Sequence, residues 1–198
     1  MTVVDIDLDI LVWRWRVLTV LGHGLSWGEG DFHIERVPGG WRGSINNQQS
    51  EDLLLGIVDQ EVVLSGWLKD VETTTEKEEE LRSKMLKKLA ASHRRPLRLH
   101  AERWLPQWTF CVWGTLEHLD AIYVGSSRTG MSAYRKIESA SQRIKLLQGP
   151  TADVLTWATE YMELTPPQVA LTRKLLSGLP ITAKDRRGAM TAKQFGAM

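Results

Sequence analysis

Apolar and polar positions alternate in the first part of the chain, which is the pattern of strands with one face toward solvent. Within residues 10–20, apolar side chains alternate with two arginines, and strict alternation predicts a half-buried strand. Residues 31–37 and 41–45 predict two further strands, joined by the Pro-Gly-Gly turn at 38–40. The front of the chain is therefore predicted to be a small antiparallel meander.

Helical spacing enters after residue 50. A Ser-Glu-Asp sequence predicts a short helix over residues 50–55, and residues 61–67 predict another strand. A longer helix is predicted over residues 75–91, with acids in its first turns and lysines in its last, as the helix dipole favours. Its apolar stripe consists of Leu81, Met85, Leu86 and Leu89.

Strand and helix patterns return in the second half. Residues 109–116 and 121–124 predict a hairpin. A helix is predicted over residues 132–147, ended by a Gly-Pro pair, and another over 165–176, with a threonine cap and prolines in its first turn. Residues 153–162 fit a helix and a strand equally well. The predicted fold class is α+β, with an antiparallel N-terminal meander, a central hairpin and C-terminal helices.

Charge is distributed unevenly along the 198 residues, although the net charge is only +1. Residues 1–80 carry 16 acidic and 6 basic side chains, and residues 81–198 carry 8 acidic and 19 basic ones. We predict an acidic, β-rich region over 1–92 that ends in a helix, a basic α+β region over 93–178 and a flexible basic tail over 179–198. The asymmetry favours a polyanionic partner for the basic half, or the two halves neutralise each other within one fold.

Cysteine usage and hydropathy indicate the compartment. Cys111 is the one cysteine, so the chain cannot form an internal disulfide, which is typical of a reducing environment. The first nine residues have no basic segment ahead of an apolar one, and no apolar run approaches 18 residues. We therefore predict a cytoplasmic protein that does not enter a membrane. The five histidines show no metal-ligand spacing, and each is expected to be solvated or packed.

Basic residues gather in two places in the second half, close to aromatic ones. Cations beside aromatic rings are typical of surfaces that follow phosphates and stack bases, although surface charge alone is also the norm for soluble proteins. The candidate nucleic-acid-binding residues are Arg94, Arg95, Arg98, Arg103, Trp104, Arg128, Lys136 and Arg143.

A motif near residue 111 adds candidate chemistry. Cys111-Val112-Trp113 ends one predicted strand, Tyr123-Val124-Gly125 ends the next, and Arg135 follows on a predicted helix. Over about residues 108–178 this arrangement resembles the GIY-YIG nuclease family, whose two tripeptides lie on a hairpin before a helix with a catalytic arginine. The resemblance implies that Tyr123 and Arg135 are catalytic residues beside the scissile phosphate, and that a later glutamate binds a divalent metal.

The chain departs from this family at three places. Trp113 stands where the family has its first tyrosine, and Cys111 stands at the first glycine. The helix over 165–177 offers Gln168 and Thr172 and no acid, and a neutral side chain does not replace a carboxylate on a hard cation. A metal ligand is therefore not identified, and a divalent metal cofactor is expected only if the protein is an active nuclease.

Two functions of different classes follow, and the sequence leaves open whether the protein is an enzyme. One is a nucleic-acid-associated accessory protein, either a degenerate or an active GIY-YIG-like phosphodiesterase. The alternative is a non-enzymatic protein-binding module, an inhibitor or adaptor, that uses its tryptophans and its acidic surface. Buried tryptophans and a continuous basic cleft would favour the first function, and an exposed tryptophan patch outside any cleft would favour the second.

Overall fold

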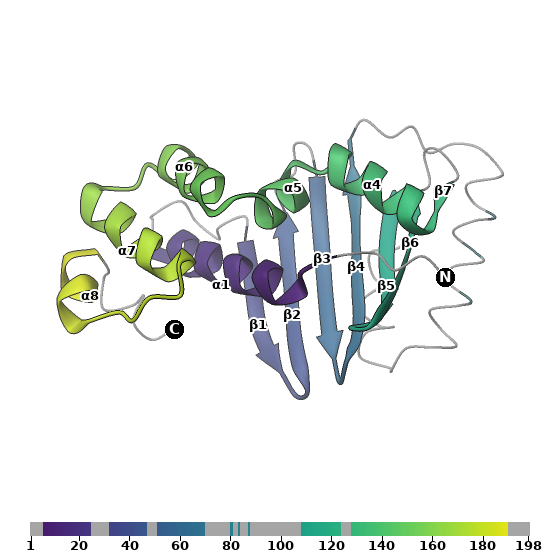
Figure 1. Cartoon of the computed structure of the whole chain (residues 1–198), viewed down its shortest axis with the longest axis horizontal. Coiled ribbons are helices and arrows are strands. Elements are labelled where there is room, and N and C mark those ends of the chain that lie inside the picture. Colours follow the sequence, from purple (N-terminus) through teal and green to yellow (C-terminus); the bar gives the residue numbers. More distant parts are fainter. Residues whose placement is uncertain are drawn as a thin grey trace. The chain divides into compact units, whose positions relative to one another are not determined.

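The computed structural model describes residues 6–24, 32–46, 51–69, 80, 83, 87, 108–123 and 128–189 (Figure 1). The strands are β1 Phe32–Val37, β2 Gly40–Asn46, β3 Glu51–Val58, β4 Glu61–Leu68, β5 Phe110–Thr115, β6 His118–Tyr123 and β7 Arg128–Thr129. The helices with described bounds are α1 Leu8–Gly24, α4 Gly130–Ala140, α5 Gln142–Gln148, α6 Thr151–Tyr161, α7 Pro166–Leu176 and α8 Ala183–Ala189. The predicted α+β class is confirmed.

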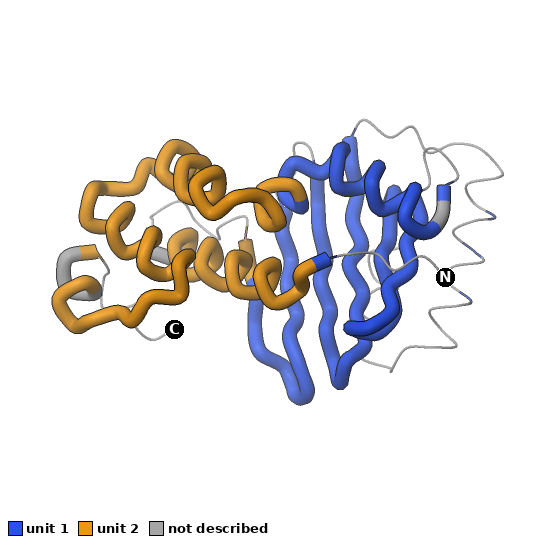
Figure 2. The backbone as a smooth tube through the Cα atoms, viewed as in Figure 1, with its two compact units in different colours: residues 1–6, 34–144 blue, residues 7–33, 145–198 orange. Residues whose placement is uncertain are grey.

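The chain divides into two compact units (Figure 2). Unit 1 comprises residues 1–6 and 34–144 and contains α4 and the sheet, except for Phe32 and His33 at the start of β1. Unit 2 comprises residues 7–33 and 145–198 and contains α1 and the C-terminal helices α6, α7 and α8. The domain boundary predicted between residues 92 and 93 lies outside the described residues.

The strands form one seven-stranded sheet whose spatial order follows the chain from β1 to β7. Each neighbouring pair from β2 to β7 is antiparallel. The meander predicted for the front of the chain and the hairpin predicted from residue 109 are therefore parts of the same sheet. In the hairpin, β5 and β6 are joined by a tighter turn than the sequence predicted.

The register assigns each strand residue to one of two faces, because directly paired residues in an antiparallel sheet share a face. Leu64, Gly66 and Leu68 lie on one face of β4, and Leu68 pairs with Glu51 of β3. On the other side of β4, Leu64 pairs with Val112 and Gly66 with Phe110, which in turn pairs with Tyr123. All of these residues therefore share one face, which we call the Glu51 face. Cys111 and Trp113 lie on the opposite face. Residues at the centre of both faces are buried, including Leu53, Leu54, Leu55, Val63, Leu64, Cys111, Val112 and Ile122.

Residues 50–55 do not form the predicted helix, since Glu51–Val58 is strand β3. The apolar run Leu53–Leu55 fits a central strand whose two faces are both buried. Such a run has no alternation, so its periodicity does not distinguish it from a short helix. Burial on both faces therefore determines the structure here, and the local cap pattern at residues 50–52 does not.

Gly66 on β4 is closely packed within the sheet. A Cβ atom at this position would lie 2.4 Å from the Asp52 carbonyl oxygen and 2.8 Å from Cζ of Phe110. Real Cβ atoms do not approach backbone this closely, so the Phe110 ring covers Gly66 only because glycine has no side chain.

The helix predicted over residues 132–147 is broken at Ser141 into α4 and α5. The Ser141 amide still donates to the Ile137 carbonyl at 2.8 Å, which completes α4. The Ser141 hydroxyl then accepts the Ile144 amide at 3.1 Å, which is the bond of an N-cap residue. A serine in the middle of a helical pattern thus ends one helix and begins the next.

Residues 10–20 form helix α1 in place of the predicted strand. The Asp7 side chain accepts the Ile10 amide at 2.9 Å and so caps the helix. Leu11, Trp15 and Leu18 are fully buried at helical spacing. The alternation around the two arginines covers too few residues to outweigh this longer helical period.

Arg14 is buried, whereas the predicted strand would have placed it on the face toward solvent. Its guanidinium donates to the carbonyls of Leu147 and Gly149 at 2.7 and 2.5 Å and to the Thr151 hydroxyl at 3.2 Å. Arg14 therefore satisfies carbonyls at the end of α5, where a cation also suits the helix dipole. Burial lowers the pKa of Arg14, against a raising influence of Asp7.

The helix predicted over residues 165–176 is confirmed as α7, and the ambiguous residues 153–162 lie largely in α6. Gln168 Oε1 accepts both the amide and the hydroxyl of Thr165, as part of a capping box. Gly178, at φ +64°, ends α7, with the Leu179 amide donating to the Lys174 carbonyl at 2.9 Å. The predicted tail over 179–198 contains helix α8, and residues 190–198 are outside the described part of the chain.

Only three residues of the helix predicted over 75–91 are described. Glu80, Ser83 and Lys87 are helical and exposed. Its predicted apolar stripe lies outside the described residues.

Candidate nucleic-acid interface

The outer side of α4 carries a row of exposed polar and basic residues in unit 1. Ala133, Tyr134 and Ile137 of this helix are buried, and α4 packs against β6 and β7 (Figure 1). The residues at the opposite side of the helix follow the spacing i, i+3, i+4, i+7 and are all exposed: Ser132, Arg135, Lys136 and Ser139. We call these four residues the α4 row.

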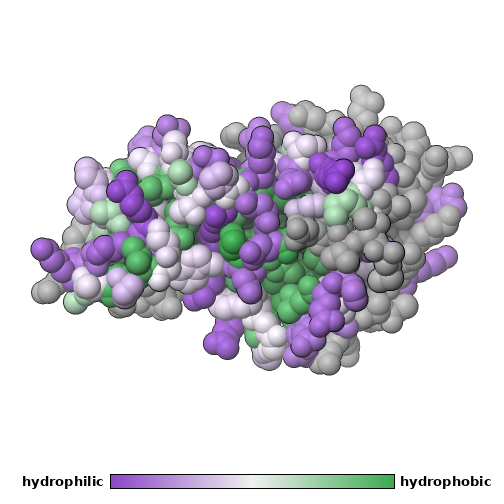
Figure 3. Space-filling view, in the orientation of Figure 1, coloured by the Kyte–Doolittle hydropathy of each residue, from purple (hydrophilic) through white to green (hydrophobic). Residues whose placement is uncertain are grey.

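Arg128 extends the basic character of the α4 row onto β7. It is exposed, and its guanidinium lies 3.5 Å from the Ser132 hydroxyl. The helix has one acidic residue, Glu138, which is half-buried. Hydrophilic side chains gather over α4 in the space-filling view (Figure 3). The row therefore offers three cations and two hydroxyls on one helical face and an adjoining strand.

Sequence reasoning identified Arg128, Arg135 and Lys136 but missed the serines. The signal was present, because Ser132 and Ser139 fall one helical turn from the two cations. Hydroxyl groups beside cations are common donors to phosphate oxygens, so the helical period would have added them.

Arg143 was predicted to contact nucleic acid, but its side chain lies in the interior. It is only 7% exposed, and its Nε lies 4.0 Å from Glu51 Oε1. Its backbone amide donates to the same carboxylate oxygen at 2.8 Å. The cation of Arg143 is thus engaged inside the protein and is not presented to solvent.

The remaining candidates lie in the part of the chain that the structure leaves out. These are Arg94, Arg95, Arg98, Arg103 and Trp104. The assignment of these five residues to a nucleic-acid surface stays a prediction.

The residues that carry the nuclease resemblance lie on β5, β6 and α4. Trp113 pairs with Asp120 and Tyr123 pairs with Phe110, and these two pairs lie on opposite faces of the sheet. Arg135 is exposed on the side of α4 away from its buried residues. Burial raises the pKa of the half-buried Tyr123 hydroxyl, which disfavours its phenolate form.

Gln168 and Thr172, the polar side chains of α7 nearest the expected metal ligand, have structural roles. Gln168 belongs to the cap of α7, and the Thr172 hydroxyl donates to the Gln168 carbonyl at 2.7 Å within the same helix. Glu160 and Glu163 are exposed. Among the described residues, no group of three or more histidine, cysteine, aspartate or glutamate side chains is arranged to hold a metal ion.

Tryptophan positions bear on the alternative function. Seven of the nine tryptophans are described, and none of these seven is exposed. Trp15 and Trp108 are buried, while Trp13, Trp41, Trp67, Trp113 and Trp157 are half-buried. Two of them are tied inside unit 2, because the indole N–H of Trp13 donates to the Leu175 carbonyl at 2.9 Å and that of Trp15 to the His33 carbonyl at 3.0 Å.

Comparison of the chain with protein-family models, with curated proteins and with solved structures yields no match. None of the helices in the described part of the chain is both long and apolar enough to cross a bilayer.

Proposed function

We propose that this protein binds nucleic acid through the phosphate backbone and that the α4 row, together with Arg128, is a contact surface. The observation that carries the proposal is the placement of Arg128, Arg135 and Lys136, which are all exposed and lie on α4 or the strand directly before it. Their charge is opposed on α4 only by the half-buried Glu138.

The chemistry of the row favours phosphate over bases. Arginine and lysine neutralise phosphates and release condensed counterions, and serine hydroxyls donate to phosphate oxygens. No aromatic side chain belongs to the α4 row, and the half-buried Tyr123, which pairs with Arg128 across β6 and β7, is only partly accessible for stacking on a base. Binding through this row is therefore expected to depend strongly on salt and weakly on sequence.

The proposal is limited to binding. A phosphodiesterase of the GIY-YIG kind would need its aromatic side chains and its arginine around one phosphate, whereas Trp113 and Tyr123 belong to opposite faces of the sheet. The alternative, a protein-binding module anchored by tryptophans, has less support because none of the seven described tryptophans is exposed.

The test is a salt titration of binding to single-stranded and double-stranded DNA and RNA with the full chain. The double variant Arg135→Glu, Lys136→Glu should weaken binding by tenfold or more at low salt and reduce the slope of log K against log salt by about 2. Lys69→Glu is the matched control, because Lys69 is an exposed cation at the end of β4.

Two results would overturn the proposal. One is that the unmodified protein binds none of these nucleic acids at low salt. The other is that the α4 double variant binds as tightly as Lys69→Glu while remaining folded by circular dichroism.

A further inference from the structure

The last described helices carry one acid among many cations. Residues 164–198 contain six basic side chains and a single acidic one, Asp185. In α8, Asp185 stands between Lys184 and the pair Arg186-Arg187. Whether α8 presents a positive surface therefore depends on where the charge of Asp185 is directed.

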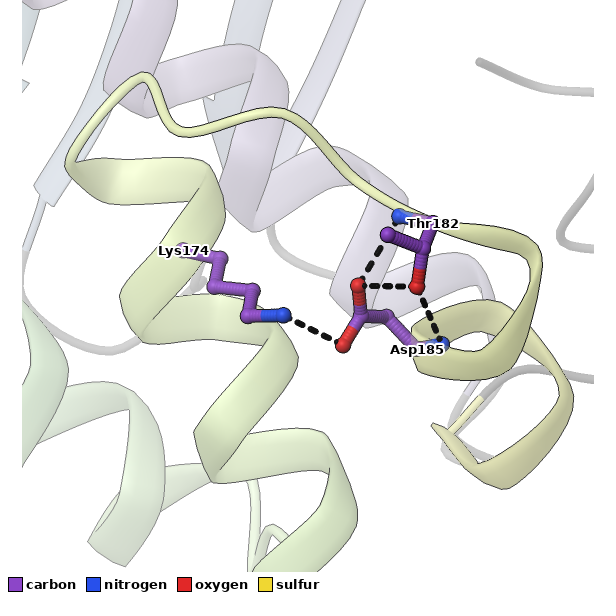
Figure 4. Close-up of polar contacts among 3 residues, drawn as sticks. All are labelled: Lys174, Thr182 and Asp185. Carbon is purple, nitrogen blue, oxygen red and sulfur yellow. Dashed lines mark hydrogen bonds and ion pairs between the residues drawn. The ribbon is translucent and has the colours of Figure 1, made fainter.

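Asp185 is directed at α7 and at its own helix start (Figure 4). Its Oδ1 accepts from Lys174 Nζ at 2.6 Å. Its Oδ2 accepts from the Thr182 amide at 2.8 Å and from the Thr182 hydroxyl at 2.7 Å. The hydrogen bond from Lys174, followed by those from Thr182, holds the pKa of Asp185 well below its usual range. The carboxylate is thus ionised and paired with Lys174.

The acid of α8 is thereby paired with Lys174, and the sequences of α7 and α8 contain no second acid. Arg173 on α7 and Lys184 on α8 are both exposed. Lys174, by contrast, is half-buried and committed to Asp185. The ion pair and the Thr182 contacts also fasten the start of α8 to α7, which places Lys184 on an ordered element.

We propose that the α7–α8 hairpin is a second contact surface for nucleic-acid phosphates, with Arg173 and Lys184 as its described cations. This inference rests on the proposed function, since it assigns the same ligand to a surface in unit 2. An anionic membrane is the less suitable partner, because α8 has only alanine as apolar side chains and so lacks a face that could enter a bilayer.

The experiment compares two double variants, Arg173→Glu, Lys184→Glu and Arg135→Glu, Lys136→Glu, with the control Lys69→Glu. A duplex of about 20–30 base pairs, the length of a typical protein site on DNA, is titrated with the full chain carrying Arg173→Glu, Lys184→Glu. Binding should weaken roughly tenfold at low salt, and the salt slope should fall by about 2. Amide hydrogen exchange of residues 166–189 should also slow when the duplex is added, which locates the contact independently of any substitution.

The outcomes separate this inference from the proposed function. If the α4 double variant weakens binding and the α7–α8 double variant matches Lys69→Glu with unchanged exchange over 166–189, the second surface is refuted and the proposed function stands. If only the α7–α8 variant weakens binding, this surface stands and the α4 row is refuted. If anionic vesicles bind and the duplex does not, both fail.

Discussion

Glu51 and Ser141 lie 90 residues apart in the sequence, and the Ser141 hydroxyl donates to Glu51 Oε2 at 2.6 Å. The other carboxylate oxygen accepts the Arg143 amide at 2.8 Å. Glu51 of β3 thus binds the start of α5 with both of its carboxylate oxygens. It accepts the Arg143 amide, one of the free amides at the start of the helix that a side chain close in sequence usually accepts. This contact connects β3 to the point where the predicted single helix divides.

Burial raises the pKa of Glu51, while Ser141 and Arg143 act in the opposite direction and Asp52 adds to the rise. A carboxyl group whose pKa is raised in the folded state contributes stability that is complete below its ordinary pKa and is lost as the pH rises through the folded value. The free energy of unfolding of the natural chain, minus that of Glu51→Gln, should therefore decrease as the pH rises above about 4.5. Urea unfolding of both proteins between pH 4 and pH 8, a range spanning the ordinary carboxyl pKa, measures this difference. A difference that stays constant or increases with pH would contradict the assignment.

Removal of the Arg14 guanidinium should destabilise unit 2. Arg14→Met leaves the Leu147 and Gly149 carbonyls without this donor, which we expect to cost about 2–4 kcal/mol, since an unsatisfied buried polar group costs about 1–3 kcal/mol. Arg173→Met is the control, because Arg173 is an exposed cation of α7 in the same unit, and a surface substitution changes stability by about 0.5 kcal/mol or less. Equal losses in chemical denaturation would show that the carbonyl contacts of Arg14 contribute little.

Two glycine substitutions should differ in their cost for separate reasons. Gly66→Ala places a Cβ 2.4 Å from the Asp52 carbonyl oxygen, and overpacking of this kind costs about 1–3 kcal/mol or more. Gly178→Ala meets no atom within 4 Å and suffers only from its φ of +64°, a conformation that costs other residues about 1 kcal/mol. Differential scanning calorimetry should show the larger drop in Tm for Gly66→Ala, and the reverse order would be inconsistent with this packing.

Cys111 should not react with thiol reagents while the protein is folded. Its side chain is fully buried, and burial raises the pKa of the thiol far above its ordinary value. A reagent therefore cannot reach the sulfur, and the reactive thiolate does not form. Labelling with a disulfide-exchange reagent at pH 8 should proceed only at the rate of opening, and it should reach one thiol per chain in denaturant. Complete labelling within seconds under native conditions would refute the burial.

The turn between β3 and β4 offers a stabilising substitution. Asp59 and Gln60 have φ of 49° and 76°, as a two-residue type I′ turn requires, and glycine is favoured at its second position. Gln60→Gly should raise the free energy of unfolding by about 0.5–1 kcal/mol, because glutamine is strained in this conformation. Asp59→Gly should gain less, since aspartate tolerates it. A loss of stability in Gln60→Gly would indicate that the side chain contributes more than its strain costs.

The sequence predicted those elements whose determinants are local. The hairpin of β5 and β6, the turn at residues 38–40 and the cap of α7 all depend on residues within a few positions of one another. Helix α1 was missed because a five-residue alternation resembled a strand, although Asp7 supplied a cap. The break at Ser141 could not be predicted, since the acceptor that accompanies it belongs to β3.

The same distinction applies to the candidate site. The exposed cations on α4 follow from the helical period within a predicted helix, so a row containing Arg135 and Lys136 was within reach of the sequence. The burial of Arg143 was not, because Glu51, which contacts its backbone and side chain, lies far away along the chain. Charge counted along a sequence therefore overstates the number of cations available to a partner.

Unit 2 is assembled from two segments that lie far apart along the chain, and this has a consequence during synthesis. Helix α1 leaves the ribosome before α7, and the carbonyl that accepts the Trp13 indole N–H belongs to Leu175, 162 residues later. Until those residues emerge, the side of α1 that packs against α7 lacks this partner, and exposed apolar surface favours aggregation during that period. A nascent chain that stops before α7 therefore leaves α1 without this contact.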